Sequence, residues 1–175
     1  HCTSSAASDV YKRQVFSWYS GMEGGNALAK IIYGDVNPSG KLPFTIARNS
    51  SDYPYFNPYT DTITYGYYHG YSLFEKYNKE IAYPFGHGLS YSNFRYENFN
   101  LTNNILEDSM LFFSVDLTNV SDIGGKEILQ FYVGFENSEI DRPLKLLRDF
   151  KKVYLKPGES KSINFKINKN DLSYY

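Results

Sequence analysis

Three side chains that could do chemistry lie in glycine-rich or tyrosine-rich stretches. His87 stands between two glycines in YPFGHGLSY (residues 83–91), where an imidazole could transfer protons. Glu23 lies in GMEGG, where a carboxylate could contact a substrate or act as an acid or base. His69 lies in YGYYHGY, among tyrosines whose rings could stack on the C–H face of a sugar. Each of these stretches also has a structural interpretation.

The structural interpretation is favoured for His87 and for Glu23. Pro84 fixes one φ angle, and the glycines on either side of His87 permit turns that other residues resist, so the stretch predicts a packed corner. Glu23 precedes a helical pattern, where a carboxylate accepts backbone N–H bonds at the helix start. The spacing in GMEGG also differs from phosphate-binding glycine loops. Neither residue is therefore predicted to be catalytic.

Composition excludes several classes of function. The chain has 175 residues, enough for one domain or for a small domain and part of another. Its 18 Lys and Arg against 19 Asp and Glu leave no basic face for nucleic acid. Cys2 is the single cysteine and the three histidines are scattered, so neither a disulfide nor a metal site is predicted. We also expect no cofactor.

The ends and the hydropathy of the chain bear on its location. No window of about 18 apolar residues occurs, so we expect a soluble chain that does not enter the membrane. The first residues do not resemble a signal peptide, which leaves both a cytoplasmic and an exported location open. Residues 1–14 include SSAASDVYKRQ, which resembles translated sequencing-adapter sequence, and are predicted to be a non-native polar tail.

The first half of the chain reads as the end of an α/β domain. The apolar run VFSWY (15–19) predicts the end of a buried strand. A helix closed by Gly34 is predicted next, because apolar residues recur at helical spacing at Ala27, Leu28, Ile31 and Ile32. LPFTI predicts a short strand, and the proline-rich stretch from Ala47 to Tyr68 predicts a long loop.

After Asn93 the pattern becomes that of an antiparallel β-sandwich. Five segments alternate apolar and polar residues between turn signals such as SDIGG and KPGES. Their spacing suits an immunoglobulin-like or fibronectin type III-like sandwich that is incomplete, because five strands leave out a final hairpin. The predicted fold class is therefore α+β: the end of an α/β sandwich domain over 15–92, followed by a truncated β-sandwich over 93–175.

Four stretches resemble the C-terminal half of glycoside hydrolase family 3, the β-glucosidase and β-xylosidase type. WYSGMEGGNALAKIIYGDVNPSGKLPFTI and ITYGYYHGYSLFEKYNKEIAYPFGHGLSYSNF are similar to the end of its α/β sandwich domain. GGKEILQFYVG and RPLKLLRDFKKVYLKPGESKSINFKI are similar to its fibronectin type III-like domain. The resemblance covers residues 15–175, and it implies a C-terminal fragment of a retaining β-glycosidase.

The resemblance places the catalytic groups outside this chain. Retaining enzymes use two carboxyl groups about 5 to 5.5 Å apart. In the family the nucleophile is an aspartate on a (β/α)8 barrel and the acid/base is a glutamate upstream of the WYSG-like segment. We therefore expect no catalytic residue here, an inactive chain that acts as scaffold, and a β-linked oligosaccharide or an aryl or alkyl glycoside bound through the barrel.

Tyr68 and His69 are the candidate substrate-binding residues, as one wall of an aglycone subsite, although packing of the loop is the alternative role. Asp116, Asp122 and Glu127 lie on predicted strands or turns and are expected to be solvated. The rival function is a non-catalytic carbohydrate-binding or adhesion module built on the β-sandwich.

Overall fold

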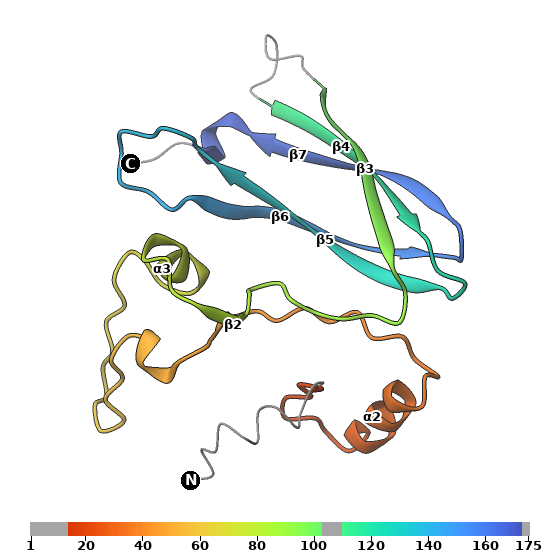
Figure 1. Cartoon of the computed structure of the whole chain (residues 1–175), viewed down its shortest axis with the longest axis horizontal. Helices are drawn as coiled ribbons and strands as arrows, with labels where there is room; N and C mark the ends of the chain where they lie inside the picture. Colours follow the sequence, from red (N-terminus) through yellow and green to blue (C-terminus); the bar gives the residue numbers. More distant parts are fainter. Residues whose placement is uncertain (1–13, 103–109, 173–175) are drawn as a thin grey trace. The chain divides into compact units, whose positions relative to one another are not determined.

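The computed structural model describes residues 14–102 and 110–172 (Figure 1). The chain divides into two compact units, one ending at Val36 and one beginning at Asn37. The predicted tail of residues 1–14 lies outside the described residues except for Gln14. Neither of the described helices longer than one turn, with nine and six residues, is long and apolar enough to cross a membrane.

The first unit contains one helix, α2 (Gly24–Ile32). It ends as predicted: Tyr33 donates its N–H to Ala29 O at 2.9 Å, and Gly34 follows with a φ of 86°. The predicted strand at VFSWY is wrong, because residues 15–19 are exposed and form no strand. A strand requires a hydrogen-bonded neighbour, and among the described residues none pairs with this segment.

The second unit begins with a segment of short elements. Strand β1 (Ile46–Ala47) pairs antiparallel with β2 (Ile81–Tyr83). Between them lie the 3₁₀ helix η1 (Ser50–Asp52) and the helix α3 (Tyr71–Lys76). The predicted strand in LPFTI is thus confirmed at its end, and the stretch before α3 is irregular apart from η1, as its prolines predict.

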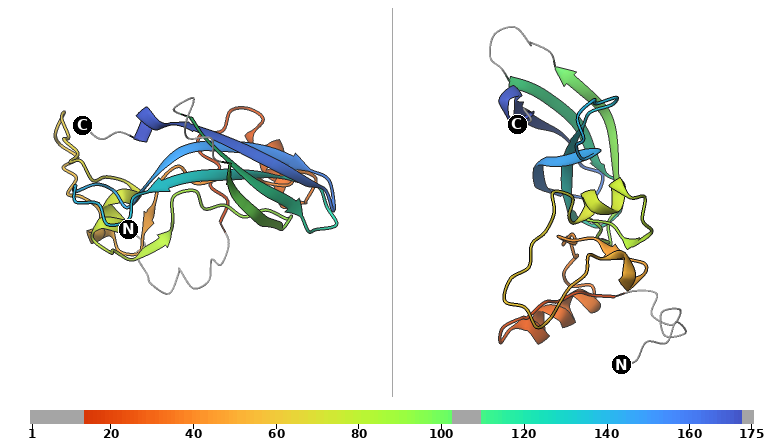
Figure 2. Two further views of the ribbon diagram at one scale, coloured as in Figure 1. Left: turned by 90° about the horizontal axis from the view of Figure 1, so that it is seen from above. Right: turned by 90° about the vertical axis from the view of Figure 1, so that its left-hand side faces the viewer.

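The remainder of the second unit contains the five predicted strands (Figures 1 and 2). They are β3 (Phe94–Thr102), β4 (Met110–Asn119), β5 (Gly125–Gly134), β6 (Lys145–Leu155) and β7 (Ser160–Asn168), followed by the 3₁₀ helix η2 (Lys169–Leu172). One sheet has the order β3-β4-β7 and the other pairs β5 with β6, all antiparallel. The predicted boundary near Ser92 stays a prediction.

The two sheets enclose an apolar core. Leu117 of β4 and Leu155 of β6 are fully buried, each worth about 1.5–3 kcal/mol by transfer from water. Phe131 of β5 packs between two other rings, 4.7 Å from Phe113 and 5.2 Å from Phe165 by ring centroids. The core therefore takes side chains from both sheets and holds them face to face.

Asn119 is a fully buried polar residue at the end of β4. Its Nδ2 donates to Ile123 O at 2.8 Å and to Leu155 O at 3.3 Å, and its Oδ1 accepts the Ser121 N–H at 3.0 Å. These bonds fasten the turn after β4 to the end of β6. The side chain can be buried because its polar atoms are paired.

Strand β5 is covered on both faces. Leu129 and Phe131 face the sandwich core, whereas the alternate residues Gln130 and Tyr132 are half-buried on the other face. There Gln130 Nε2 donates to Gly86 O at 3.1 Å. The segment before the sandwich therefore lies against the outer face of β5.

Candidate functional site beside strand β5

The corner YPFGHGLSY pairs with the loop before β1. Gly86 donates its N–H to Leu42 O at 2.8 Å, and Leu42 donates its N–H to His87 O at 2.7 Å. Gly86 has a φ of 79°, which disfavours a side chain. A Cβ at Gly88 would overlap the carbonyl oxygen of Gly40. The glycines of the corner are thus needed for its backbone path and for close approach of the loop.

The ring of His87 has a packing role. It is half-buried, with its centroid 5.2 Å from that of Tyr83 and the two rings tilted by 40°. The backbone N–H of His87 donates to Pro84 O at 3.1 Å, which closes the turn. These contacts agree with the structural interpretation of the corner.

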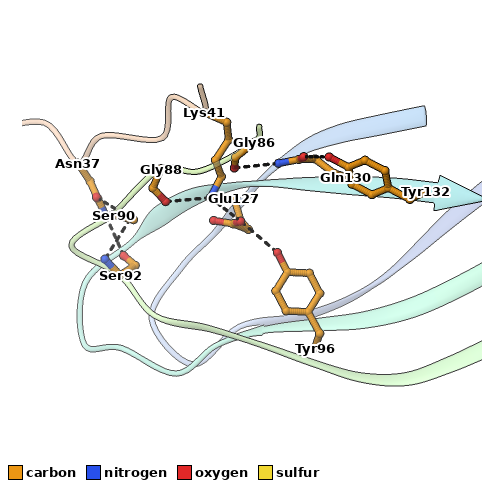
Figure 3. A network of polar contacts seen from close by, with 10 residues as sticks. All are labelled: Asn37, Lys41, Gly86, Gly88, Ser90, Ser92, Tyr96, Glu127, Gln130 and Tyr132. Atoms are coloured by element: carbon orange, nitrogen blue, oxygen red, sulfur yellow. Dashed lines mark hydrogen bonds and ion pairs between the residues drawn. The ribbon is translucent and has the colours of Figure 1, made fainter. Parts of the chain in front are cut away.

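A buried ion pair joins the loop before β1 to strand β5 (Figure 3). Lys41 Nζ lies 2.9 Å from Glu127 Oε1, and the two side chains are 17% and 11% exposed. Tyr96 O–H donates to the same carboxylate oxygen at 3.0 Å. The Tyr96 residue is 48% exposed, but desolvation around its hydroxyl, followed by the negative charge of Glu127, raises the pKa of Tyr96 above its ordinary value.

The prediction that Glu127 is solvated is therefore wrong. The carboxylate can be buried because the ammonium of Lys41, from a distant part of the sequence, and the hydroxyl of Tyr96 compensate its lost hydration. One signal in the sequence could have revealed it. In GKEILQF, Glu127 has the same alternation as the core residues Leu129 and Phe131.

A second polar cluster in Figure 3 centres on Asn37. Its Nδ2 donates to Ser92 Oγ at 2.8 Å and to Gly124 O at 3.1 Å. Its Oδ1 accepts the Ser90 hydroxyl at 2.8 Å and the Tyr91 N–H at 2.9 Å. One amide thus connects the start of the second unit, the end of the corner and the turn before β5, a role that the sequence did not reveal.

Tyr68 is held by charged residues. Its O–H donates to Asp141 Oδ1 at 2.7 Å, and Lys76 forms an ion pair with the same oxygen. Lys76 Nζ also lies 4.8 Å from the centroid of the Tyr68 ring. The hydrogen bond from Lys76, followed by that from Tyr68, lowers the pKa of Asp141. These contacts tie the loop before α3 to the loop between β5 and β6.

His69 lies next to Tyr68 in sequence, but the structure gives it a different setting. Its side chain is exposed, and its Nδ1 lies 3.2 Å from Tyr67 O. A carbonyl only accepts, so Nδ1 carries the hydrogen in this contact. The structure fixes the orientation of both candidate side chains, and whether they contact a substrate stays a prediction.

A cavity of about 550 Å³ lies beside the outer face of β5. Its aromatic wall contains Tyr71, Phe85 and Tyr132. Glu75 of α3 and Lys145 of β6 line it as well and form an ion pair of 2.8 Å. Neither Tyr68 nor His69 is among its lining residues.

The remaining acidic candidates occupy ordinary positions. Glu23 is exposed and accepts Asn26 Nδ2 at 2.7 Å; its side chain makes no capping bond to a backbone N–H, so that part of the prediction is wrong. Asp122 is exposed, as predicted. Asp116 is half-buried, and hydrogen bonds from Asn98 and then Ser162 lower its pKa.

Within residues 14–102 and 110–172, no three His, Cys, Asp or Glu residues are grouped to hold a metal ion.

Comparison with known proteins identifies the family. Residues 7–91 match the Glycosyl hydrolase family 3 C-terminal domain, and residues 127–175 match the Fibronectin type III-like domain. The chain belongs to glycosyl hydrolase family 3 and represents its C-terminal region. The resemblance drawn from the motifs is therefore confirmed.

The similar proteins of this family are β-glucosidases. The chain is 38% identical to a probable β-glucosidase G of Neosartorya fischeri, over 90% of this chain and 23% of that protein. It is 37% identical to the thermostable β-glucosidase B of Acetivibrio thermocellus, over 95% of this chain and 23% of that protein. The chain thus spans about a quarter of the length of these curated relatives.

Solved structures show the same fold. β-Glucosidase 3B of Thermotoga neapolitana in complex with glucose matches with a TM-score of 0.81 and 33% identity, covering 90% of this chain and 23% of that one. A family 3 β-glucosidase of Bifidobacterium adolescentis matches with a TM-score of 0.80 and 35% identity, covering 91% and 24%. The predicted fold class, with its antiparallel fibronectin type III-like sandwich, is confirmed.

Proposed function

We propose that this chain serves as the C-terminal part of a retaining β-glucosidase that hydrolyses β-linked oligosaccharides or aryl and alkyl glucosides without a cofactor. The observation that carries the proposal is the 35–38% identity to β-glucosidases over most of the chain. The order of the two family matches supports it, because the match to the Fibronectin type III-like domain follows the match to the C-terminal domain along the sequence.

In this proposal the chain is a scaffold. The nucleophilic aspartate and the acid/base glutamate lie in other parts of the enzyme, so the chain by itself is inactive. Its task is to hold the sandwich in a fixed position on the preceding domain. Two contacts support this role. The buried Lys41–Glu127 pair joins the segment before Asn93 to strand β5, and the Asn37 cluster joins it to the turn before β5.

We assign Tyr68 and His69 to the aglycone side of the substrate site. The contacts of Tyr68 with Asp141 and Lys76 fix its ring at the base of the loop. His69 has an exposed ring whose orientation is set by Tyr67 O. A rigid aromatic ring beside an exposed imidazole suits stacking on a sugar and donation to a hydroxyl.

A chimera tests the proposal. Residues 15–175 replace the matching region of the β-glucosidase B of Acetivibrio thermocellus, and release of nitrophenol from 4-nitrophenyl β-D-glucoside is measured. We expect saturable hydrolysis by the chimera, as by the parent enzyme. A chimera that is insoluble, or folded and inactive, contradicts the proposal.

Two variants of the chimera test the aglycone wall. We expect His69→Ala to raise KM for cellobiose about three- to tenfold while its kcat stays near that of the unmodified chimera, because the lost contact is one of ground-state binding. Lys152→Ala, a change at an exposed position on strand β6 and outside this loop, is the control. Tyr68→Ala removes the ring that is proposed to stack on the sugar, and unchanged KM in Tyr68→Ala and His69→Ala alike would leave the two residues with a packing role alone.

A further inference from the structure

The cavity beside β5 has the size of a small-molecule site. Its volume of about 550 Å³ falls within the range of about 300 to 1,000 Å³ that is typical of ligand pockets. Its lining comes from the loop before β1, helix α3, the corner, and strands β3, β5 and β6. All of these elements belong to the second unit, so the cavity is formed within one compact body.

One wall of the cavity is aromatic and ordered. The Tyr71 ring lies 5.0 Å from Phe85 by centroids, and 6.1 Å from Tyr132 at an angle of 89°. The Tyr71 hydroxyl accepts the Leu147 N–H at 3.0 Å, and the Tyr132 hydroxyl donates to Gln130 Oε1 at 2.6 Å. Lys145 Nζ lies over the Tyr132 ring at 5.5 Å from its centroid, so stacking on this fixed wall falls to Tyr71 and Phe85, at a low cost in conformational entropy.

The charges around the cavity are balanced. Each lysine in its lining pairs with a carboxylate at 4.0 Å or less: Lys41 with Glu127, Lys79 with Asp52 and Lys145 with Glu75. An ionic ligand would have to compete with these pairs, whereas a neutral ligand can use them as hydrogen-bonding groups. The charge pattern therefore favours a neutral molecule.

One carboxylate oxygen of Glu75 is available to accept a hydrogen bond. Its Oε1 forms an ion pair with the Lys145 ammonium, whereas its Oε2 is buried and accepts no hydrogen bond from any described residue. A buried acceptor without a partner is unfavourable, because it has lost its hydration and gained no hydrogen bond. The terminal torsion of Glu is broad, so the carboxylate of Glu75, which lines the cavity, can rotate to accept a hydrogen bond from a hydroxyl group there.

We propose that this cavity binds a neutral saccharide, a mono- or disaccharide, that stacks on the aromatic wall and donates a hydroxyl to Glu75. The site goes beyond the function proposed above, because it needs neither catalytic carboxylate nor the aglycone wall. Its occupancy can be measured on the 175-residue chain, so failure of one proposal does not decide the other.

The test is a titration of the chain with D-glucose and with cellobiose. Binding is monitored by isothermal titration calorimetry and by the chemical shifts of the backbone amides in NMR spectra. We expect saturable binding in the millimolar range with shifts concentrated in α3 and in β5. Glu75→Gln should weaken binding about tenfold, the effect of losing a hydrogen bond to a charged acceptor. Glu139→Gln, a matched change at an exposed loop position, should leave it unchanged.

Several results would overturn the proposal. They are the absence of saturable binding, shifts that lie outside α3 and β5, and equal affinities in Glu75→Gln and Glu139→Gln. D-gluconate serves as the charged counterpart of glucose, and tighter binding of gluconate would contradict a neutral ligand. The NMR map decides the location even if Glu75→Gln does not fold.

Discussion

Lys41 Nζ and Glu127 Oε1 lie 2.9 Å apart, although one residue precedes β1 and the other lies in β5. Lys41 also donates to Gly88 O at 3.2 Å, so one ammonium contacts both the corner and the sandwich. Both side chains are largely buried, and a carboxylate in such a place is tolerated only with its partner. The ion pair therefore fixes the position of the sandwich on the segment that precedes it.

The first prediction concerns this pair. Glu127→Gln should lower the free energy of unfolding by about 2–4 kcal/mol, because it leaves the buried ammonium of Lys41 without its counter-charge. The measurement is urea denaturation of the chain. Glu97→Gln is the matched control: Glu97 pairs with Arg95 at 3.0 Å, but both side chains are about half exposed, so the change should stay within about 0.5 kcal/mol. Equal losses in the two variants would contradict a special role for Glu127.

The second prediction concerns Tyr96 at high pH. Its pKa is raised by burial and then by Glu127, so the folded state favours the neutral phenol. The stabilisation is fully present below the ordinary pKa of 10.0 and is lost as pH rises through the raised value. The absorbance at 295 nm of the chain minus that of Tyr96→Phe should therefore rise only at a pH well above the ordinary pKa of 10.0. A difference curve centred near the ordinary pKa would show that the Tyr96 hydroxyl is solvated rather than held by Glu127.

The third prediction concerns the corner. Gly86→Ala should destabilise the chain by about 1–3 kcal/mol, because its φ of 79° is unfavourable for alanine and its Cβ would displace the Gln130 amide. Gly40→Ala is the control, because a Cβ there meets nothing within 4 Å. We expect it to be neutral or slightly stabilising in thermal unfolding. A loss of stability in Gly40→Ala as large as in Gly86→Ala would contradict the prediction, because the effect would then not depend on the backbone conformation at Gly86.

The fourth prediction concerns Asn119. Asn119→Ala leaves Ile123 O and the Ser121 N–H without their partner and should cost about 2–4 kcal/mol. Asn57→Ala removes a comparable contact, the bond from Tyr59 N to Asn57 Oδ1, at an exposed site and should cost less than about 1 kcal/mol. Chemical denaturation of both variants gives the comparison. A small loss at Asn119 would show that water replaces the amide.

Local patterns predicted most of the fold. Helix α2 with Gly34 and the five long strands follow from spacing that lies within each segment. The strand expected at VFSWY failed, because a strand also needs a partner and none pairs with it in the described part of the chain. A run of apolar residues is therefore not enough to predict a strand.

The site was harder to predict because it depends on contacts between distant segments. The burial of Glu127 requires Lys41, and the cavity requires elements from the loop before β1 to β6. Tyr68 and His69 were selected by residue type, and the structure shows how each is held without showing what it binds. The motifs indicated the family, whereas the polar contacts that join the segments needed the structure.

The most direct test of the proposed scaffold role is the activity of the chain by itself. Purified residues 15–175 are incubated with 4-nitrophenyl β-D-glucoside and with the corresponding β-xyloside, beside the active chimera as a positive control. We predict no release of nitrophenol above the enzyme-free rate, because neither of the two catalytic carboxylates of a retaining glycosidase is assigned to this chain. Saturable turnover by a clean preparation would contradict the account.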